Sequence, residues 1–210
     1  MHVADGILSG PVIIAGFAGT AALAALTLRN MDLEEIPKVS VITSAFFIAS
    51  LIHIPIGPSS IHLLLNGLVG VILGFRAFPA IMLAIVLQAI LFGHGGVTVI
   101  GVNSLMLGGG ALAAYGIWQL RHWFSFSQNE IVFAGLAGAT GTIVSGILLS
   151  TALITTGEAF IATAGLVLAY HIPVMVIEAI VAAVCVGFLK RVKPQILAGQ
   201  RVIKPIVPTS

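Results

Sequence analysis

The sequence predicts an all-α membrane protein, a single bundle of seven transmembrane helices that takes up residues 1–210. Only 8% of its residues are charged and 59% are hydrophobic, whereas a soluble domain carries roughly 25% charged residues. Apolar stretches close to the length of a membrane crossing, about 20 residues, recur along the chain. The 24 glycines suit the close helix packing found in lipid. So few charges cannot cover a water-facing surface, which leaves the membrane as the expected solvent.

The predicted spans follow one another between polar breaks. They cover about Ile7–Leu28, Val39–Ile54, Ile61–Phe75, Ala80–Phe92, Val97–Leu120, Glu130–Leu153 and Ile172–Leu189. The third begins behind Ser59 or Ser60, which are both good helix N-caps. The third and fourth spans are short for a full crossing, so local thinning of the bilayer or shielding by protein is expected there.

The last apolar stretch, Ala159–Leu189, is too long for one untilted crossing. Pro173 divides it, which predicts a half-helix over Phe160–Tyr170 before the seventh span. In this interpretation Pro173 lies in the first turn of that span, where its missing N–H costs little.

The basic residues predict the orientation. With seven spans, all nine Lys and Arg side chains fall on the side of the C-terminus. The positive-inside rule then places the C-terminus in the cytoplasm, with residues 191–210 as a basic cytoplasmic tail, and Met1 outside. The start lacks a basic region, so no cleavable signal peptide is expected. A net charge of +2 gives no argument for nucleic acid as a partner.

Residues 1–9 form a candidate metal-chelating segment. The α-amine of Met1, the amide nitrogen of His2 and Nδ1 of its ring can close two fused chelate rings on one ion. Three nitrogens in a plane with one corner open suit Ni(II) or Cu(II), and Zn(II) prefers tetrahedral sites instead. Because the amide must lose its proton, affinity should fall as the pH drops. Met-His taken alone is better explained by an ordinary start followed by a polar residue, so the metal hypothesis depends on the rest of the chain.

The histidines strengthen the metal hypothesis. On the seven-span map only His122 lies inside, and the other five gather at the outer face; these are His2, His53, His62, His94 and His171. Imidazole is the commonest metal ligand among side chains. His62 is the best candidate for the open corner, and Asn66, four residues later, would share its helix face. His94 is a candidate second-shell group beside the inserted terminus. The alternatives are interfacial residues at His53 and His62 and an exposed turn residue at His94.

Three polar residues lie inside predicted spans. Gln88, Asn103 and Glu178 are functional candidates by their position in lipid, or they join helices as interhelical hydrogen bonds. His171 and Glu178 lie seven residues apart, which is about 10 Å along one helix face. Glu178 could orient a histidine, carry a proton, or be protonated and only hydrogen-bonded. Enzyme motifs are absent, including a phosphate-binding loop, so no ATP hydrolysis and no catalytic residue are expected in this chain.

Four stretches, in order, resemble one family. Met1–Ser9 (MHVADGILS) is similar to MHIPDGFLS, and Leu87–Gly96 (LQAILFGHGG) to LQALFFGHGG. Gly101–Asn103 is similar to GAN, and Ala169–Glu178 (AYHIPVMVIE) to AHLPLAVIEG. The chain therefore resembles the CbiM/NikM family, the substrate-binding membrane (S) component of energy-coupling-factor (ECF) nickel/cobalt transporters. It departs from the family at Val3-Ala4, where Ile-Pro is usual, and in the loop before His62.

The resemblance implies a seven-helix fold and a bound substrate, Ni(II) or Co(II). It implies metal ligands at Met1, His2 and His62. It further implies four partners, namely a transmembrane coupling (T) protein, two cytoplasmic ATPase (A) subunits and a small accessory membrane protein. No accessory domain is expected to be fused at the C-terminus.

The sequence therefore predicts metal uptake across the cytoplasmic membrane by one component of an ATP-driven transporter. Two other classes stay open on the residues alone. One is a membrane scaffold or assembly subunit whose histidines are interfacial, and the other is a permease for a small organic solute. Metal binding by the purified protein separates both from the transporter hypothesis.

Overall fold

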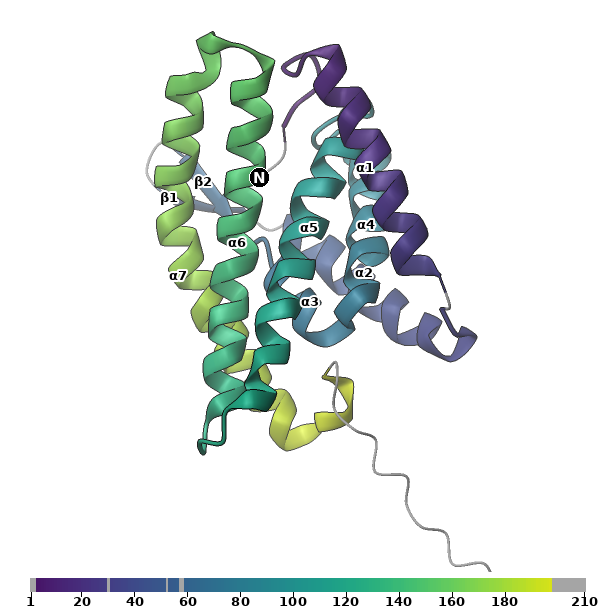
Figure 1. The fold of residues 1–210 in the computed structure, drawn as a ribbon, viewed down its shortest axis with the longest axis vertical. Helices are drawn as coiled ribbons and strands as arrows, with labels where there is room; N and C mark the ends of the chain where they lie inside the picture. Colours follow the sequence, from purple (N-terminus) through teal and green to yellow (C-terminus); the bar gives the residue numbers. More distant parts are fainter. Residues whose placement is uncertain (1–2, 30, 52, 57–58, 198–210) are drawn as a thin grey trace, which may run out of the picture.

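Helices that run back and forth along one long axis make up most of the computed structural model, which describes residues 3–29, 31–51, 53–56 and 59–197 (Figure 1). The α-helices are α1 (Gly10–Leu28), α2 (Ile36–Leu51), α3 (Asn66–Leu73), α4 (Ala77–Phe92), α5 (Ile100–Gln119), α6 (Asn129–Thr156) and α7 (Ile161–Val192). Short 3-10 turns are η1 (Leu33–Glu35), η2 (Gly74–Arg76), η3 (Leu120–Trp123), η4 (Glu158–Phe160) and η5 (Pro194–Ile196). Strands β1 (His53–Ile56) and β2 (Ser59–His62) pair antiparallel.

Successive segments alternate in direction. Helices α1, α3, α5 and α7 run toward one end of the bundle, and α2, α4 and α6 return from it (Figure 1). That end, which we call the basic end, holds every Lys and Arg that the structure describes: Arg29, Lys38, Arg76, Arg121, Lys190, Arg191 and Lys193. Arg201 and Lys204 lie outside the described residues. The one-sided distribution of charge predicted from the sequence is therefore present in the described part of the fold.

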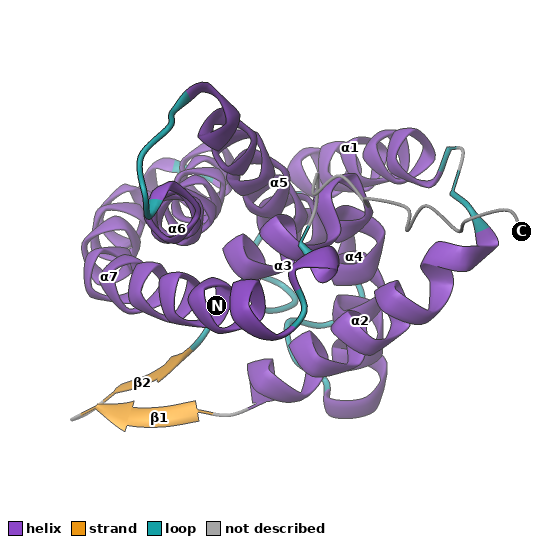
Figure 2. Ribbon diagram, turned by 90° about the horizontal axis from the view of Figure 1, so that it is seen from below, coloured by secondary structure: helices purple, strands orange, loops and turns teal. Residues whose placement is uncertain are grey.

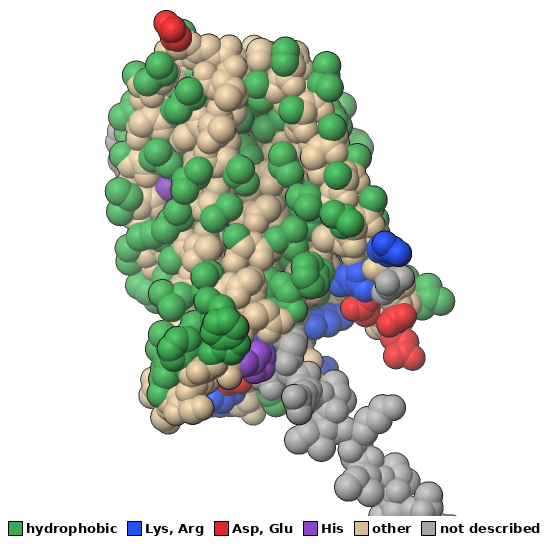
Figure 3. Space-filling view, viewed as in Figure 1, with side chains coloured by type: hydrophobic (Ala, Val, Ile, Leu, Met, Phe, Trp, Pro, Cys, Tyr) green, Lys and Arg blue, Asp and Glu red, His purple; other side chains and the backbone are tan. Residues whose placement is uncertain are grey.

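The outer surface is apolar along most of its length (Figure 3). Among the described residues, five helical stretches are long and apolar enough to cross a membrane: Gly10–Leu28, Asn66–Phe92, Ile100–Trp123, Asn129–Thr156 and Glu158–Val192. Helix α2, with 16 residues, is shorter. Side chains such as Ile14 (70% exposed) and Val184 (66%) point away from the protein. The chain is a multi-pass, all-α membrane protein whose apolar belt faces lipid.

The third predicted span, Ile61–Phe75, is wrong in its first part. Strand β2 takes up Ser59–His62, and α3 starts only at Asn66. The residue before it, Leu65, has a left-handed backbone with φ of 50°, which ends any helix that would arrive from its N-terminal side. His62 is therefore not in the first helical turn, and it does not share a helix face with Asn66. The strand pair projects from the side of the bundle (Figure 2).

The predicted break at Pro173 is also wrong. Helix α7 is continuous over its 32 residues with Pro173 inside it, so Phe160–Tyr170 is not a separate half-helix. A proline inside a membrane helix is tolerated because neighbouring groups re-satisfy the freed backbone atoms. As a consequence, His171 does not lie at the end of the bundle. It lies ten residues into α7, about 15 Å along the helix axis.

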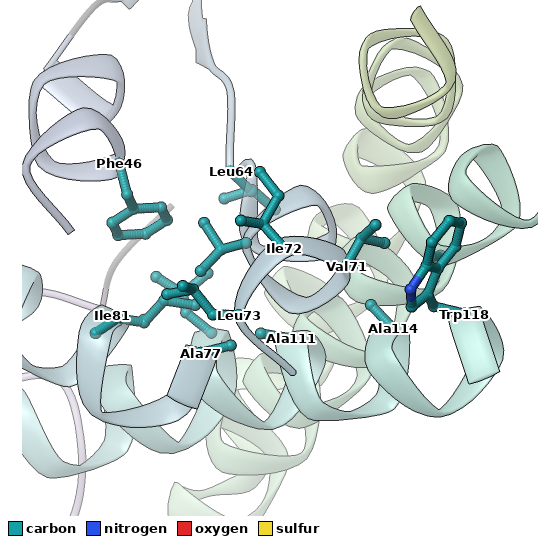
Figure 4. Close-up of a cluster of buried hydrophobic side chains, with 14 of the residues drawn as sticks. Phe46, Leu64, Val71, Ile72, Leu73, Ala77, Ile81, Ala111, Ala114 and Trp118 are labelled. Atoms are coloured by element: carbon teal, nitrogen blue, oxygen red, sulfur yellow. The ribbon is translucent and has the colours of Figure 1, made fainter. Parts of the chain in front are cut away.

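The core lies where α3, α4 and α5 meet. Val71, Ala111 and Trp118 are fully buried there, and their side chains converge between the helices (Figure 4). The guanidinium carbon of Arg121 lies 3.8 Å from the centre of a Trp118 ring, which is a cation–π contact. This packing holds α3 near the middle of the bundle, as the view along the axis shows (Figure 2).

Two glycines allow α3 to approach its neighbours closely. A Cβ on Gly67 would lie 2.6 Å from Cα of Gly138 on α6, and one on Gly70 would lie 2.2 Å from the carbonyl oxygen of Ala111 on α5. Both obstacles are backbone atoms of packed helices, which cannot give way as a flexible side chain can. The first turn of α3 is therefore held at a set depth between α5 and α6.

Replacing Gly70 by alanine is expected to destabilise the fold. The added methyl group would overlap the Ala111 carbonyl, and overpacking of this kind costs about 1–3 kcal/mol. A lower midpoint of thermal unfolding in detergent would measure it. Gly116→Ala on α5 is the matched control, because a Cβ there meets nothing within 4 Å. An equal midpoint for the two variants would contradict the close approach.

Candidate metal-capture site

The beginning of the described chain is buried inside the bundle. Val3 is 4% exposed and packs with Val99, Met106 and Leu149 of the neighbouring helical region. Its N–H donates to Oδ1 of Asn103 at 3.0 Å, and Nδ2 of Asn103 donates back to the Val3 carbonyl at 3.1 Å. Asn103 lies in α5 and is 1% exposed. One side-chain amide thus satisfies both polar groups of a buried residue near the terminus, as buried backbone requires.

Residues 4–7 are exposed and are tied to the loop before α5, and Leu8 returns to the interior, where it packs in the same cluster as Val3. The Asp5 carboxylate accepts hydrogen bonds from the Thr98 N–H, at 3.1 Å, and from the Thr98 hydroxyl. Gly96 has a φ of 102°, and a Cβ on it would lie 2.1 Å from that carboxylate. Ser9 N–H then donates to Oγ1 of Thr156 at the end of α6, at 3.4 Å. The segment is therefore fixed at both ends.

A buried carboxylate terminates the strand pair and starts α3. Glu178, on α7, is 1% exposed. The Leu65 N–H lies 3.0 Å from each of the two carboxylate oxygens of Glu178 and donates to them. The Leu64 N–H donates to Oε1. Unsatisfied N–H groups and the positive end of the helix dipole favour a carboxylate at this position. Glu178 thereby supports the left-handed backbone of Leu65 and fixes the point, two residues after β2, where the chain enters the bundle.

Asn66, the first residue of α3, joins three helices. Its Nδ2 lies within hydrogen-bond distance of Oγ of Ser145 at 2.8 Å, the Gly141 carbonyl at 3.2 Å and the Leu107 carbonyl at 3.3 Å. Ser145 in turn donates to the Met106 carbonyl at 3.0 Å. Leu107 is four residues after Asn103, so this network lies one turn along α5 from the residue that holds Val3.

His171 faces the same region from α7. It is 4% exposed, and its Nδ1 lies 2.7 Å from the Val167 carbonyl. A carbonyl only accepts, so Nδ1 carries the proton and the neutral ring presents Nε2 as an acceptor. The ring packs on Gly146, where a Cβ would lie 3.0 Å from it. Gly146 follows Ser145, the residue bonded to Asn66.

The sequence singles out six residues besides the predicted ligands: Asn66, Gln88, His94, Asn103, His171 and Glu178. Four of them lie on neighbouring turns of the packed helices. With Ser145 they form what we call the interior polar cluster: Asn66, Asn103, Ser145, His171 and Glu178. Every member is buried. They come from α3, α5, α6 and α7, so the cluster forms only when these four helices pack.

Gln88 and His94 lie apart from that cluster. Gln88 is 1% exposed on α4 and donates to the hydroxyl of Ser50 on α2, while its Oε1 is buried without a hydrogen-bond partner. His94 is half-buried in the turn after α4, with its ring centre 6.5 Å from that of Phe92. Its N–H donates to the Gln88 carbonyl at 3.2 Å. Both residues belong to the α2–α4 side of the bundle.

The predicted ligands themselves are only partly described. Met1 and His2 lie outside the described residues. For His53 and His62 the structure gives the backbone alone, in which the two residues are direct partners across the β1–β2 pair. Within the described residues no group of three or more His, Cys, Asp or Glu side chains is placed to hold a metal ion.

Sequence reasoning missed Asp5, Thr98 and Ser145. Asp5 lies inside the quoted terminal motif but received no role, because a single acidic residue next to a glycine is typical of any turn. Ser145 lies in a run of small residues that indicates only helix packing. No local signal marks Asp5, Thr98 or Ser145 as functional, since each of them bonds to a partner more than 35 residues away in the sequence.

Comparison with known proteins agrees with this architecture. The profile of CbiM, described as the cobalt uptake substrate-specific transmembrane region, matches residues 2–196. The chain belongs to the CbiM family. It is a substrate-specific membrane component for cobalt or nickel uptake, which makes it part of a transporter and not an enzyme.

Relatives with assigned descriptions span the length of the chain. A protein of Haemophilus influenzae described as "Putative metal transport protein" is 33% identical over 199 residues, which cover 94% of this chain and 97% of the relative. The fused nickel transport protein NikMN of Rhodobacter capsulatus is 30% identical over 225 residues, or 96% of this chain and 65% of that longer protein. Members of this CbiM family therefore occur alone and within fused chains.

Solved structures share the fold. A crystal structure of a truncated transition metal transporter superposes with a TM-score of 0.72 at 20% identity, covering 91% of this chain and 99% of the other. A second transition metal transporter gives a TM-score of 0.73 at 20% identity and covers 93% of that chain. At this identity the likeness establishes the fold alone.

Proposed function

We propose that this CbiM-family protein captures Ni(II) or Co(II) with its own N-terminus. The α-amine of Met1, with the amide and ring nitrogens of His2, would supply three planar ligands, and His62 would supply the fourth. The observation that carries the proposal is the burial of Val3 and its paired hydrogen bonds to Asn103. Two residues extend at most about 7 Å, so the terminal nitrogens stay within that reach of a buried, fixed point.

The chain that follows His62 supports this proposed role. Leu64 and Leu65 are bonded to Glu178 on α7, so the end of β2 is tethered to the helix that also carries His171. His53 is the direct register partner of His62, and residues in such a pair have Cβ atoms about 4.5–5.5 Å apart. The strand pair thus brings the backbone positions of two histidines into register, shortly before the entry of α3.

The interior polar cluster positions these ligands in the proposal. Asn103 holds the backbone of residue 3, and Glu178 holds the backbone two and three residues after His62. Asn66, which follows Leu65, bonds to the carbonyls of Leu107 on α5 and Gly141 on α6. Groups that orient metal ligands commonly matter about 10–100-fold for affinity. His171 offers Nε2 to the same interior.

We further propose seven crossings with the basic end in the cytoplasm. The five helical stretches that can span a membrane, together with α2 and the division of Asn66–Phe92 into α3 and α4, give seven alternating segments. All described Lys and Arg residues lie at one end, which by the positive-inside rule faces the cytoplasm. Metal would then enter from the opposite end, where residues 4–9 are fixed.

Partners are proposed from the fused relatives. NikMN of Rhodobacter capsulatus and the protein of Methanocorpusculum labreanum described as a fused cobalt transport protein CbiMQ, of which this chain spans 36%, join a matching region to further sequence. This supports association with other transporter components. In an ECF-type assembly these would be a coupling (T) protein, two ATPase (A) subunits and a small accessory protein, with the ATPases driving release of the metal inside the cell.

Replacing Asn103 by leucine is expected to weaken Ni(II) binding about 10–100-fold. Leucine cannot form either hydrogen bond to Val3, so the terminal segment would lose its anchor. Equilibrium dialysis of the purified full chain with Ni(II) and Co(II) measures the change, and thermal unfolding checks that the variant is folded.

Gln88→Leu is the matched control. It also removes a buried amide from a membrane helix, but from the side chain that bonds to Ser50 on α2. Since Oε1 of Gln88 is already unpaired, the substitution should cost little stability and leave affinity within about threefold. Equal losses for the two variants would refute the role of Asn103, and unchanged binding by Asn103→Leu would do the same.

A further inference from the structure

The basic end holds a cavity that metal capture does not use. Its volume is about 480 Å³, within the usual range of small-molecule sites. Three cationic side chains, Arg29, Lys38 and Arg76, line it with one carboxylate, Glu35. Leu26, Phe75 and Tyr115 are among the other described residues that line it. Positive charge is therefore in excess at this cavity.

Internal contacts build the walls of the cavity. Nε of Arg76 pairs with Oε2 of Glu35 at 2.9 Å, and its Nη1 donates to the carbonyls that end α1, including that of Arg29 at 3.2 Å. Lys38 donates to the Ile72 carbonyl at 2.8 Å. These bonds join the end of α1 to η1 and η2, and α2 to the end of α3, so the side chains of Arg76 and Lys38 are held in place before any ligand arrives.

Two positive charges remain without a carboxylate partner among the described residues. Arg29 makes no side-chain hydrogen bond or ion pair there, and its backbone carbonyl alone is used. The ammonium group of Lys38 has three donors, of which the Ile72 carbonyl takes one. Glu35 pairs with Arg76 and also attracts Lys38, while Asp32 and Glu34 of the same connection are exposed and do not line the cavity. Three cationic side chains thus share one carboxylate in the described lining, which leaves positive charge and free donors for an anion.

The rim of the cavity is lipid-facing. Leu26 is 66% exposed and Phe75 is 62% exposed, both on the apolar outer surface. The rings of Phe75 and Tyr115 form an edge-to-face pair, with centres 5.2 Å apart and planes at 70°. Aromatic residues of this kind mark the level of the lipid headgroups. In Figure 3 the basic side chains lie directly below this apolar surface. The cavity thus opens at the boundary between acyl chains and water.

We propose that this cavity binds the phosphate headgroup of an anionic phospholipid. Phosphate oxygens would accept hydrogen bonds from Arg29 and Lys38, while the acyl chains follow the exposed surface of Leu26 and Phe75. Basic pockets between membrane helices bind such headgroups elsewhere, and guanidinium groups suit phosphate oxygens. The bound lipid would join the α1–α2 connection to η2 from outside the protein.

Native mass spectrometry of the delipidated, full-length protein in detergent tests the proposal. Phosphatidylglycerol and phosphatidylcholine are added separately, and inorganic phosphate is added in a third arm. Each Lys or Arg near a membrane surface contributes about 1 kcal/mol, or roughly fivefold, toward anionic lipid. Phosphatidylglycerol is therefore expected to bind about tenfold or more tightly than phosphatidylcholine, and millimolar phosphate should not displace it.

Arg29→Gln/Lys38→Gln is expected to abolish the preference for phosphatidylglycerol. Arg191→Gln/Lys193→Gln is the control, since it removes two charges from exposed positions at the same end but outside this cavity. Arg29→Gln alone breaks no described side-chain contact, so this variant should fold normally. Its affinity for phosphatidylglycerol should still fall about threefold or more. Equal binding of the two lipids, equal loss in the control, or displacement by phosphate would overturn the lipid assignment.

Discussion

One extra glycine before Met1 is expected to reduce metal uptake to background. The extension converts the α-amine of Met1 into a peptide nitrogen and moves the free amine three bonds further from the His2 amide. The fused chelate rings can then no longer close on one ion with the same atoms. Val3 is buried and bonded on both its polar groups, so the anchor of the segment stays the same while the chain before it becomes one residue longer. A terminal chelate is unusually sensitive to this change, whereas a side-chain site is not.

Two measurements separate loss of uptake from loss of the protein. Nickel uptake is measured in cells that produce the chain with its partners. Uptake is the readout because the extended Gly-Met-His start can close a four-nitrogen chelate of its own, which leaves no open corner for His62 and need not lower Ni(II) affinity in dialysis. The amount of extended protein in the membrane is measured in parallel and should stay unchanged. The same glycine added after Ser210 is the control, and N-terminal sequencing establishes which start is present. Normal uptake by the N-terminally extended protein would end the terminal-chelate proposal.

His62→Ala is expected to lower Ni(II) affinity by more than about 100-fold, beyond what the loss of an orienting group usually costs. In the proposal it removes the fourth nitrogen of a planar set, and water is a weaker ligand for the open corner. The fold should survive, since β2 projects from the side of the bundle (Figure 2). Thermal unfolding of the variant without metal measures this directly, and its midpoint should match that of the unchanged protein.

Two further histidines make the assignment specific. His122 lies in η3 at the basic end, so His122→Ala should bind Ni(II) normally. His53 is the register partner of His62, so His53→Ala asks which member of the pair is the ligand. Loss of binding in His53→Ala, with normal binding in His62→Ala, would transfer the role to His53. Normal binding in both single variants would remove the strand pair from the site.

The long helices could be predicted from the sequence with good accuracy. The predicted span Glu130–Leu153 corresponds to α6 at Asn129–Thr156, and Val97–Leu120 to α5 at Ile100–Gln119. Their length and hydropathy are local properties, so a window of about 20 residues contains the necessary information. The placement of Lys and Arg at one end of the bundle followed from the number and order of these predicted spans.

The third span and Pro173 could not be predicted in this way. The start of α3 depends on Glu178, which lies 114 residues from Leu64 in the sequence. The continuity of α7 depends on its packing against α6. The presence of a proline in the sequence gives no information about that packing. In both places the usual local signals, Ser N-caps and a proline break, were overridden by contacts with a distant helix.

The sequence by itself determined the class of protein, its apolar length, its charge asymmetry and the residues able to bind metal, because all of these depend on residue type and on short spacing. The tertiary structure decided which polar residues act together. It placed Asn103 on Val3, 100 residues away, bonded Glu178 to Leu65 and Asn66 to Ser145, and bonded Gln88 to Ser50 on α2. The reason is physical: a polar group buried in an apolar bundle must find a partner, and only the packing of the helices determines which partners lie within reach.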